Sequence, residues 1–226
     1  MDRNLFFDFF DVLFNGMDGR NAMGRLVEQR IGISRDEYRM KDYDECWELW
    51  KLLNRGELSE VGYWEKILEK YKWDATPEDF MWCTRQALKI QIPGTYDILS
   101  ELYRGSYNLY LVSDIWADMR DEMIKAYPWI KVFFKKCYFS CDFHSIKSDE
   151  GYFEKICADA GVKPSDSIMI DDYDVNIMRA KSAGMDGIIF ENANQLRREL
   201  YEKLGTNCFA ERSSEIRRIA ENSSME

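Results

Sequence analysis

Histidine is almost absent from this chain of 226 residues, and its scarcity removes several kinds of chemistry. His144 is the single histidine, so a Ser-His-Asp or Cys-His site would have to use it, and the sequence contains no Gly-x-Ser-x-Gly elbow. Metal sites rich in histidine are excluded as well. Any chemistry must therefore rest on carboxylates, lysine, hydroxyls and a hard metal ion.

Cysteine pairs at metal-ligand spacing are also missing. The six cysteines, at positions 46, 83, 137, 141, 157 and 208, include no Cys-x-x-Cys. The closest pair, Cys137 and Cys141, lies along a predicted strand without histidine partners, so a zinc site is not expected. We interpret the six as buried thiols in a reducing compartment, which makes the cytoplasm the expected location.

Long apolar runs and an excess of basic charge are lacking too. No stretch approaches the ~20 apolar residues that a membrane span needs. The short apolar run near the start is broken by Asp8 and Asp11, so no signal peptide is predicted. The net charge of −10 argues against nucleic acids and anionic membranes as partners. A small phosphate can still bind where a few cations gather in a cleft.

The residues that are abundant are apolar and aromatic. Hydrophobic residues make up 46% of the chain and aromatic residues 15%, which is enough to build a sizeable core. The rings indicate a densely packed interior, with an aromatic-lined pocket as the alternative.

Strand and helix patterns alternate over most of the chain, which predicts a parallel sheet. The apolar run around Asp8 is predicted as the first strand, and residues 18–90 then carry only helical signals, including helix starts at Ser59 and Thr76. We therefore predict an α/β fold, a Rossmann-like parallel sheet core with an inserted all-helical cap. The predicted core comprises residues 1–16 and 91–226, and the predicted cap comprises residues 17–90.

Polar side chains stand at the predicted carboxyl ends of the strands, where ligands gather in such sheets. A carboxylate there can be a nucleophile, several carboxylates can hold Mg²⁺, and a hydroxyl and a lysine can neutralise phosphate oxygens. These parts suit phosphoryl transfer. The residues are Asp8, Ser113, Asp114, Asp171 and Asp172, with Lys147 in a loop after the strand at 137–139.

Four segments in order resemble the haloacid dehalogenase-like hydrolase superfamily with a helical cap. They are FDFFDVLFN at 7–15, LVSD at 111–114, SCDFHSIK at 140–147 and IDDYDVN at 170–176. The resemblance covers roughly residues 5–191. Residues 55–59 resemble a cap stretch of the branch that includes α-D-glucose-1-phosphate phosphatase.

The resemblance implies a role for each matching residue. Asp8 would be the nucleophile, Ser113 would bind the phosphate and Lys147 would stabilise the aspartyl-phosphate. Mg²⁺ would be held by Asp8, the backbone carbonyl of Phe10, Asp171 and Asp172. The expected function is a magnesium-dependent phosphatase on a small phosphorylated metabolite, with sugar phosphates among the candidates.

Two further residues are candidates for substrate contact. Arg20 begins the predicted cap, and arginine suits phosphate, although a surface arginine is the simpler interpretation. Asp114 stands where the superfamily often has asparagine, and orienting its loop is the alternative role.

The chain departs from the superfamily pattern in two segments, one next to Asp8 and one around Lys147. Phe10 replaces the aspartate that protonates the leaving group in most of these phosphatases, a contribution worth typically 10²–10⁴-fold. Asp11 and His144 take places usually held by glycine, and Ser148 takes the place of a proline. Asp11 could act as a substitute acid.

The alternatives to a phosphatase are a 2-haloacid dehalogenase-type hydrolase, which needs no metal, and a binding or regulatory protein.

Overall fold

A buried apolar strand begins the described part of the chain. The computed structural model describes residues 4–15, 17–42, 46–88 and 90–205, and for residues 17–21 and 39–42 it describes the backbone alone. Strand β1 (Asn4–Asp8) is buried along its whole length. Strands that are apolar on both faces are typical of parallel sheets covered by helices on both sides.

Four more strands run parallel to β1 and complete the sheet. They are β2 (Asn108–Ser113), β3 (Lys136–Phe139), β4 (Ser167–Asp171) and β5 (Asp186–Ile189), in the order β3-β2-β1-β4-β5. Asp8 lies level with Val112 of β2, and Phe7 lies level with Ile170 of β4. The carboxyl ends of three strands therefore meet at one edge, and the predicted α/β fold is confirmed.

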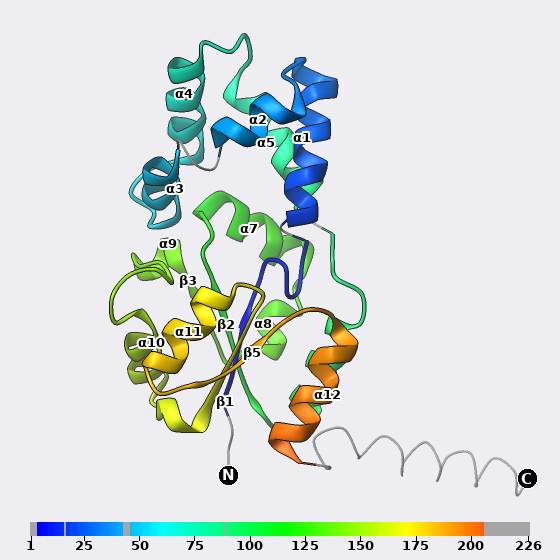
Figure 1. Ribbon diagram of the computed structural model, residues 1–226, viewed down its shortest axis with the longest axis vertical. Helices are drawn as coiled ribbons and strands as arrows, with labels where there is room; N and C mark the ends of the chain where they lie inside the picture. Colours follow the sequence, from blue (N-terminus) through cyan, green and yellow to red (C-terminus); the bar gives the residue numbers. More distant parts are fainter. Residues whose placement is uncertain (1–3, 16, 43–45, 89, 206–226) are drawn as a thin grey trace, which may run out of the picture.

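Helices cover both faces of the sheet because successive side chains of each strand point to opposite sides. Phe6 packs in a cluster with helices α10 (Tyr152–Ala160) and α11 (Asp174–Ser182). Leu5 and Phe7 face the other way, into a cluster that includes residues of α6 (Thr95–Arg104), α8 (Ile130–Phe133) and α12 (Ala193–Leu204). Figure 1 shows α10 and α12 at opposite sides of the sheet.

Among the described residues, five helices lie between β1 and α6 in the sequence, and together they form what we call the helical cap. They are α1 (Met17–Ile31), α2 (Arg35–Asp42), α3 (Trp47–Asn54), α4 (Glu60–Tyr71) and α5 (Pro77–Ala87). Residues 17–42 and 46–88 contain no strand, as the helical signals predict. Figure 1 places the cap beyond the carboxyl ends of the strands. The exact boundaries of core and cap stay predictions.

Local sequence explains where two cap helices begin. The Ser59 hydroxyl accepts a hydrogen bond from the Gly62 N–H (3.1 Å), which satisfies one of the exposed donors at the start of α4. Thr76 and Asp79 form a reciprocal capping box at the start of α5, and Pro77 occupies the first helical position. Both helix starts were predicted from the sequence.

One prediction about the cysteines is wrong. Cys137 lies in β3, but Cys141 lies in the short helix α9 (Ser140–Phe143) instead of on the same strand. The Ser140 hydroxyl accepts a hydrogen bond from the Ile115 N–H (2.9 Å) and donates one to the Ile115 carbonyl (3.2 Å), and the chain turns there. Four cysteines are buried and Cys137 is half-buried, whereas position 208 lies outside the described residues.

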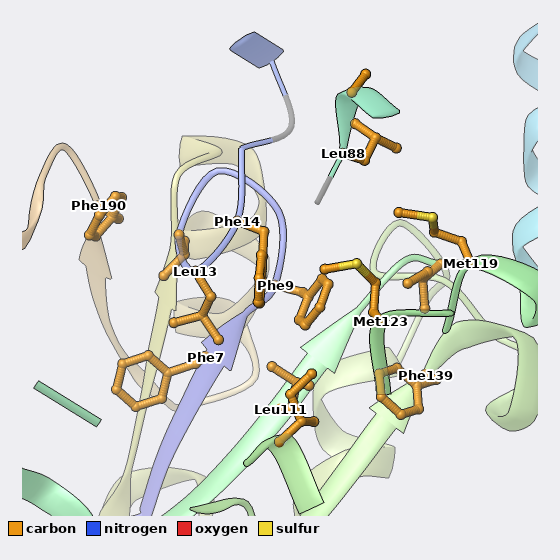
Figure 2. Close-up of a cluster of buried hydrophobic side chains, with 14 of the residues drawn as sticks. Phe7, Phe9, Leu13, Phe14, Leu88, Leu111, Met119, Met123, Phe139 and Phe190 are labelled. Atoms are coloured by element: carbon orange, nitrogen blue, oxygen red, sulfur yellow. The ribbon is translucent and has the colours of Figure 1, made fainter. Parts of the chain in front are cut away.

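Aromatic packing fixes the loop that follows β1. The N–H groups of Leu13 and Phe14 both donate to the Phe9 carbonyl (2.9 and 3.0 Å), which closes a tight turn. The Phe9 and Phe14 ring centroids lie 4.7 Å apart, and Figure 2 shows this pair beside Met123 of α7 (Ala117–Ala126). The residues that follow Asp8 are therefore anchored in the core.

Within the described ranges, no helix combines the length and the hydrophobicity that crossing a membrane requires.

Candidate active site

Asp8 ends β1 and lies at the centre of a buried polar cluster. Its Oδ1 accepts a hydrogen bond from the Phe9 N–H (2.6 Å) and lies 2.6 Å from the Lys147 Nζ. Burial raises the pKa of Asp8 well above its usual range, Lys147 lowers it, and the neighbouring Asp171 and Asp172 raise it again. Positive charge beside Asp8 therefore decides whether it is ionised.

Lys147 is the buried cation of this cluster. It follows α9, and its Nζ lies 2.6 Å from Asp8 Oδ1 and donates to Asp171 Oδ2 at 2.8 Å. Burial on its own would lower the pKa of Lys147, but the carboxylates of Asp171, Asp8 and Asp114 outweigh it and hold the pKa above its usual value. Lys147 is thus charged at neutral pH and bridges β1 to β4.

Asp171 and Asp172 follow each other at the end of β4 but differ in surroundings. Asp171 is fully buried, and besides Lys147 it accepts from the Tyr173 N–H (2.9 Å) and from Asn176 Nδ2, which donates to both Oδ1 (3.1 Å) and Oδ2 (3.2 Å). Asp172 is half-buried, and burial followed by repulsion from Asp171 and Asp11 raises its pKa to about 6. Of these two aspartates, Asp172 is therefore the one that is accessible to solvent.

The cluster has the donor set of a hard divalent cation. Carboxylate oxygens of Asp8, Asp171 and Asp172 all lie within 4.8 Å of one another. Mg²⁺ takes oxygen ligands, and a cation here would relieve the repulsion that raises the pKa values of Asp8 and Asp172. Asp171 already accepts four hydrogen bonds, so it can become a direct ligand only by giving one up. The residues fit the metal, with Asp8 and Asp172 best placed to hold it.

Ser113 ends β2, next to Asp8 of β1, and Asp114 follows it. Ser113 is fully buried, and its hydroxyl has no hydrogen-bond partner among the described residues. An unpaired buried hydroxyl is costly, and a phosphate oxygen would satisfy it. Asp114 accepts from the Lys147 backbone N–H (3.1 Å), and burial raises its pKa to about 6. Asp114 thus contacts the loop of Lys147, and its part in substrate binding stays a prediction.

A pocket of about 640 Å³ opens above these groups, between the strand ends and α3 of the cap. Five of the predicted site residues line this pocket: Asp8, Phe10, Asp114, Lys147 and Asp172. Ser113 and Asp171 are buried and are not part of its wall. The wall is completed by Asp11, Trp47, Trp50, Ser148, Tyr173, Val175, Asn176 and Arg179.

Arg20 was predicted as a substrate contact, whereas His144 was noted as a departure from the family pattern. Arg20 lies on α1, but its side chain falls outside the described part of the structure. His144 is exposed, and its Nδ1 lies 2.9 Å from the Arg55 carbonyl oxygen instead of lining the pocket. His144 therefore joins core and cap.

The two replacements of glycine share a backbone conformation. Asp11 has a φ of 57° and His144 a φ of 51°, both in the left-handed region that favours glycine. The chain keeps the turns that glycine would allow and accepts the strain of a side chain in each. At Asp11 the result is a carboxylate in the wall of the pocket.

A second contact ties the cap to the loop of Lys147. The Arg55 guanidinium forms a two-point ion pair with Asp149, with Nε 3.3 Å from Oδ2. Gly56, next to Arg55, has a φ of 73°, and a Cβ there would meet the Cys141 carbonyl oxygen at 2.8 Å. The loop between α3 and α4 therefore lies directly on α9 at Cys141, and Arg55 pairs with Asp149, two residues after Lys147.

The tryptophans of the pocket are functional candidates that the sequence prediction missed. Helical spacing puts Trp47, Trp50 and Leu53 on one stripe of α3. Leu53 is buried, whereas both tryptophans line the pocket. The available signal was a pair of tryptophans in the predicted cap of a ring-rich chain.

Several solved structures share this fold. A HAD-like family hydrolase from Porphyromonas gingivalis is 24% identical, with a TM-score of 0.70, and the match covers 88% of this chain and 98% of that one. A HAD family enzyme from Bacteroides thetaiotaomicron, in complex with magnesium and inorganic phosphate, is 20% identical, with a TM-score of 0.65 and coverage of 84% and 94%. The L-2-haloacid dehalogenase of Xanthobacter autotrophicus is 17% identical, with a TM-score of 0.61 and coverage of 89% and 83%.

Two characterised relatives match in sequence. Flavin mononucleotide hydrolase 1 of Arabidopsis thaliana is 27% identical over 118 residues, which are 51% of this chain and 46% of the relative. Drimenol cyclase drtB of Aspergillus calidoustus is 24% identical over 216 residues, 91% of this chain and 37% of the relative. The chain spans less than half the length of either. The family model of haloacid dehalogenase-like hydrolases matches residues 40–190, more than half of the chain, so the chain belongs to that family.

Proposed function

We propose that this hydrolase is a magnesium-dependent phosphatase that acts on a small phosphorylated metabolite through an aspartyl-phosphate on Asp8. The observation that carries the proposal is the contact of Asp8 Oδ1 with Lys147 Nζ (2.6 Å) beside two more carboxylates, at the wall of a pocket under the cap. A carboxylate nucleophile, a buried lysine and an oxygen-only cation site are together the parts that phosphoryl transfer needs.

The residues of the chain divide the work of the first half-reaction. Asp8 Oδ attacks phosphorus, the bond from phosphorus to the leaving oxygen breaks, and an acyl phosphate remains on Asp8. Lys147 Nζ stabilises the negative charge of the transferring group and lowers the pKa of Asp8 against the effect of burial. The Ser113 hydroxyl donates to a phosphate oxygen. In the second half-reaction a water molecule attacks phosphorus, which releases inorganic phosphate and restores Asp8.

The carboxylates of Asp8 and Asp172, with Asp171 and the Phe10 carbonyl, would hold the metal ion. Magnesium, when bound, supplies positive charge that orients the phosphate and offsets charge in the transition state. The Bacteroides enzyme of the same fold contains magnesium and inorganic phosphate, which supports this assignment.

Phe10 sets the limits of the leaving group. A phenyl ring cannot donate a proton, so the departing oxygen must be a weak base or must take its proton from elsewhere. Asp11 lines the same pocket one residue further on, and water has access there. The enzyme should therefore favour substrates whose leaving oxygen tolerates a negative charge.

Dehalogenation is the second candidate, because Phe10 echoes the aromatic residue found at that place in 2-haloacid dehalogenases and the Xanthobacter enzyme shares the fold. The Asp171–Asp172 pair favours a metal, which dehalogenation does not need. The Arabidopsis relative also favours phosphate esters, because flavin mononucleotide is a phosphate monoester. A cytoplasmic location belongs to the same proposal.

The test is phosphate release from acetyl phosphate, 4-nitrophenyl phosphate and a set of sugar phosphates, with Mg²⁺ and with EDTA. Asp8→Asn is measured beside Asp121→Asn, which changes an exposed aspartate paired with Arg120 outside the pocket wall. We expect release that needs Mg²⁺, disappears in Asp8→Asn and persists in Asp121→Asn. A phosphoenzyme labile to hydroxylamine would identify the acyl phosphate.

Halide release from 2-chloropropionate in EDTA, with no phosphate release, would replace the phosphatase by the dehalogenase. No reaction with either substrate class would favour a binding or regulatory protein.

A further inference from the structure

The cap contributes two residues to the pocket wall among the described residues, and both are tryptophans. Trp47 and Trp50 stand one turn apart on α3, with ring centroids 4.8 Å apart and ring planes 10° from parallel. Both are half-buried. Trp50 also packs against the main hydrophobic cluster, so its ring is held from behind. The pair therefore forms a braced aromatic wall opposite the catalytic groups.

The chemistry of this wall suits a flat ring better than a sugar. A sugar can also lie against an indole face, but its hydroxyls need polar partners, and in the described wall the cap offers only an N–H donor on each indole. Stacking of a planar ring on an aromatic side chain adds binding energy without requiring a particular ring. Across the described wall, the cap supplies faces for stacking and the strand ends supply the polar groups.

The opposite rim adds a ring and a cation. Tyr173 follows Asp172 and is 55% exposed, and Arg179 lies on α11, where its guanidinium donates to Asn176 Oδ1 (3.3 Å). Arg179 has no carboxylate partner among the described residues, although the wall carries four aspartates. Arginine stacks on planar groups and binds anionic or carbonyl oxygens. Polar substituents of a bound ring would find a donor there.

We propose that the substrate is a phosphate monoester whose leaving group carries a planar aromatic or heteroaromatic ring, stacked on Trp47 and Trp50. The proposal rests on the proposed phosphatase function and names its substrate class. Two sources share this chemistry. In an aryl phosphate the ring bears the phosphate directly, which also meets the demand of Phe10 for a weakly basic leaving oxygen. In a nucleotide-like ester an alkyl chain separates ring and phosphate.

Matched substrate pairs isolate the ring from the leaving group. Flavin mononucleotide and ribitol 5-phosphate share an alkyl leaving group and differ in the ring. 4-Nitrophenyl phosphate is an ester and acetyl phosphate is an anhydride. Both release a weakly basic oxygen, and only the first has a ring. We expect a kcat/KM about ten-fold higher for the ring-bearing member of at least one pair. The pair that shows the difference identifies the source of the ring.

Variants of α3 assign the difference to the tryptophans. Trp47→Leu keeps an apolar side chain and should raise KM about ten-fold for the ring-bearing substrate, with KM for its partner unchanged. Trp47→Phe keeps a ring and should restore most of the preference. Trp82→Leu is the control, because Trp82 lies on α5, is 42% exposed and is not in the pocket wall.

The outcomes separate this inference from the phosphatase itself. If both members of each pair are hydrolysed equally well, or if Trp47→Leu affects both equally, ring recognition is wrong and the phosphatase stands. If no phosphate is released from any substrate, the phosphatase is wrong, and binding of flavin mononucleotide decides. Quenching of flavin fluorescence that Trp47→Leu abolishes would support the ring site, and the absence of binding would overturn it.

Discussion

The two walls of the pocket differ in how they are built. The wall at the strand ends carries aspartates whose positions follow from the register of three parallel strands, together with Lys147 from the loop after α9. The wall on the cap side consists of two tryptophans on one helix, placed by how a helical insertion packs on the core. Backbone hydrogen bonds thus fix the proposed chemistry, whereas side-chain packing fixes the proposed choice of substrate.

The two walls also differ in how firmly they are held. Asp8 and Asp171 at the strand ends are buried and are joined to each other through Lys147. The cap meets the core at the loop that follows α3, through Arg55, Gly56 and the carbonyl that contacts His144. Changes at the strand ends should therefore remove the reaction, while changes at the loop should alter stability and substrate binding.

The largest effect should come from Lys147→Met, which keeps the length of the side chain and removes its charge. Asp8 and Asp171 would then repel each other without a buried cation, and one would take up a proton. We expect phosphate release to fall by more than about 10²-fold, measured at saturating Mg²⁺. Lys136→Met, at the exposed ion pair with Asp159, should change it less than about two-fold. Near-normal turnover in Lys147→Met would show that the lysine is structural.

Gly56→Ala should have the next largest effect. The new Cβ would meet the Cys141 carbonyl oxygen at 2.8 Å, so the loop after α3 must shift. Gly151→Ala is a matched control, because its φ of 72° is almost the same and nothing lies within 4 Å of its Cβ position. Urea unfolding should show a loss of about 1 kcal/mol in the control and about 2–3 kcal/mol in Gly56→Ala. Equal losses would mean that the close approach costs nothing.

A smaller effect concerns pH and Asp114. Its pKa is raised by burial to about 6, above the value of about 3.9 in an unfolded chain. As the pH falls, Asp114 takes up a proton in the folded protein before it does so in the unfolded chain. Its contribution to the free energy of unfolding therefore increases as the pH is lowered from about 7 to about 4. In EDTA, wild type should gain about 1–2 kcal/mol more than Asp114→Asn over that range. Parallel stability curves for the two proteins would contradict the raised pKa.

The smallest effect should come from relieving left-handed backbone. His144→Gly in the core should raise the free energy of unfolding by about 0.5 kcal/mol. The relief of backbone strain stabilises the fold, and the loss of the contact with the Arg55 carbonyl offsets part of that gain. Lys72→Gly, at the left-handed end of α4 in the cap, should add about 1 kcal/mol, since no such contact to the core is given up. A loss of stability in His144→Gly would show that its contact with the cap outweighs the strain.

The strand-end wall was predictable because its signals are local. An apolar run that ends in Asp8, and a second that ends in Asp171, each fix the position of a carboxylate once the sheet is parallel. The caps at Ser59 and Thr76 are equally local, and the structure places both as predicted. The roles of these site residues stay predictions until they are measured.

The cap-side wall was not predictable in the same way. Helical periodicity places Trp47, Trp50 and Leu53 on one side of α3, but that side meets both the core and the pocket. Which residue faces which depends on how the helix is placed over the sheet, and contacts between Arg55 and Asp149, far apart in the sequence, set that placement. The turn into α9 escaped prediction for the same reason, because it depends on Ser140 meeting Ile115.

The ion pair between Arg55 and Asp149 makes the cap and the lysine loop parts of one equilibrium. Asp149 lies two residues after Lys147, and its Oδ2 also accepts from the Ile146 N–H (3.1 Å) and the Ser145 hydroxyl (3.0 Å). Under the proposed function, a phosphate that orders this loop would strengthen the hold on the cap, and a ring bound under the cap would strengthen the hold on phosphate. Thermodynamic reciprocity requires the two factors to be equal.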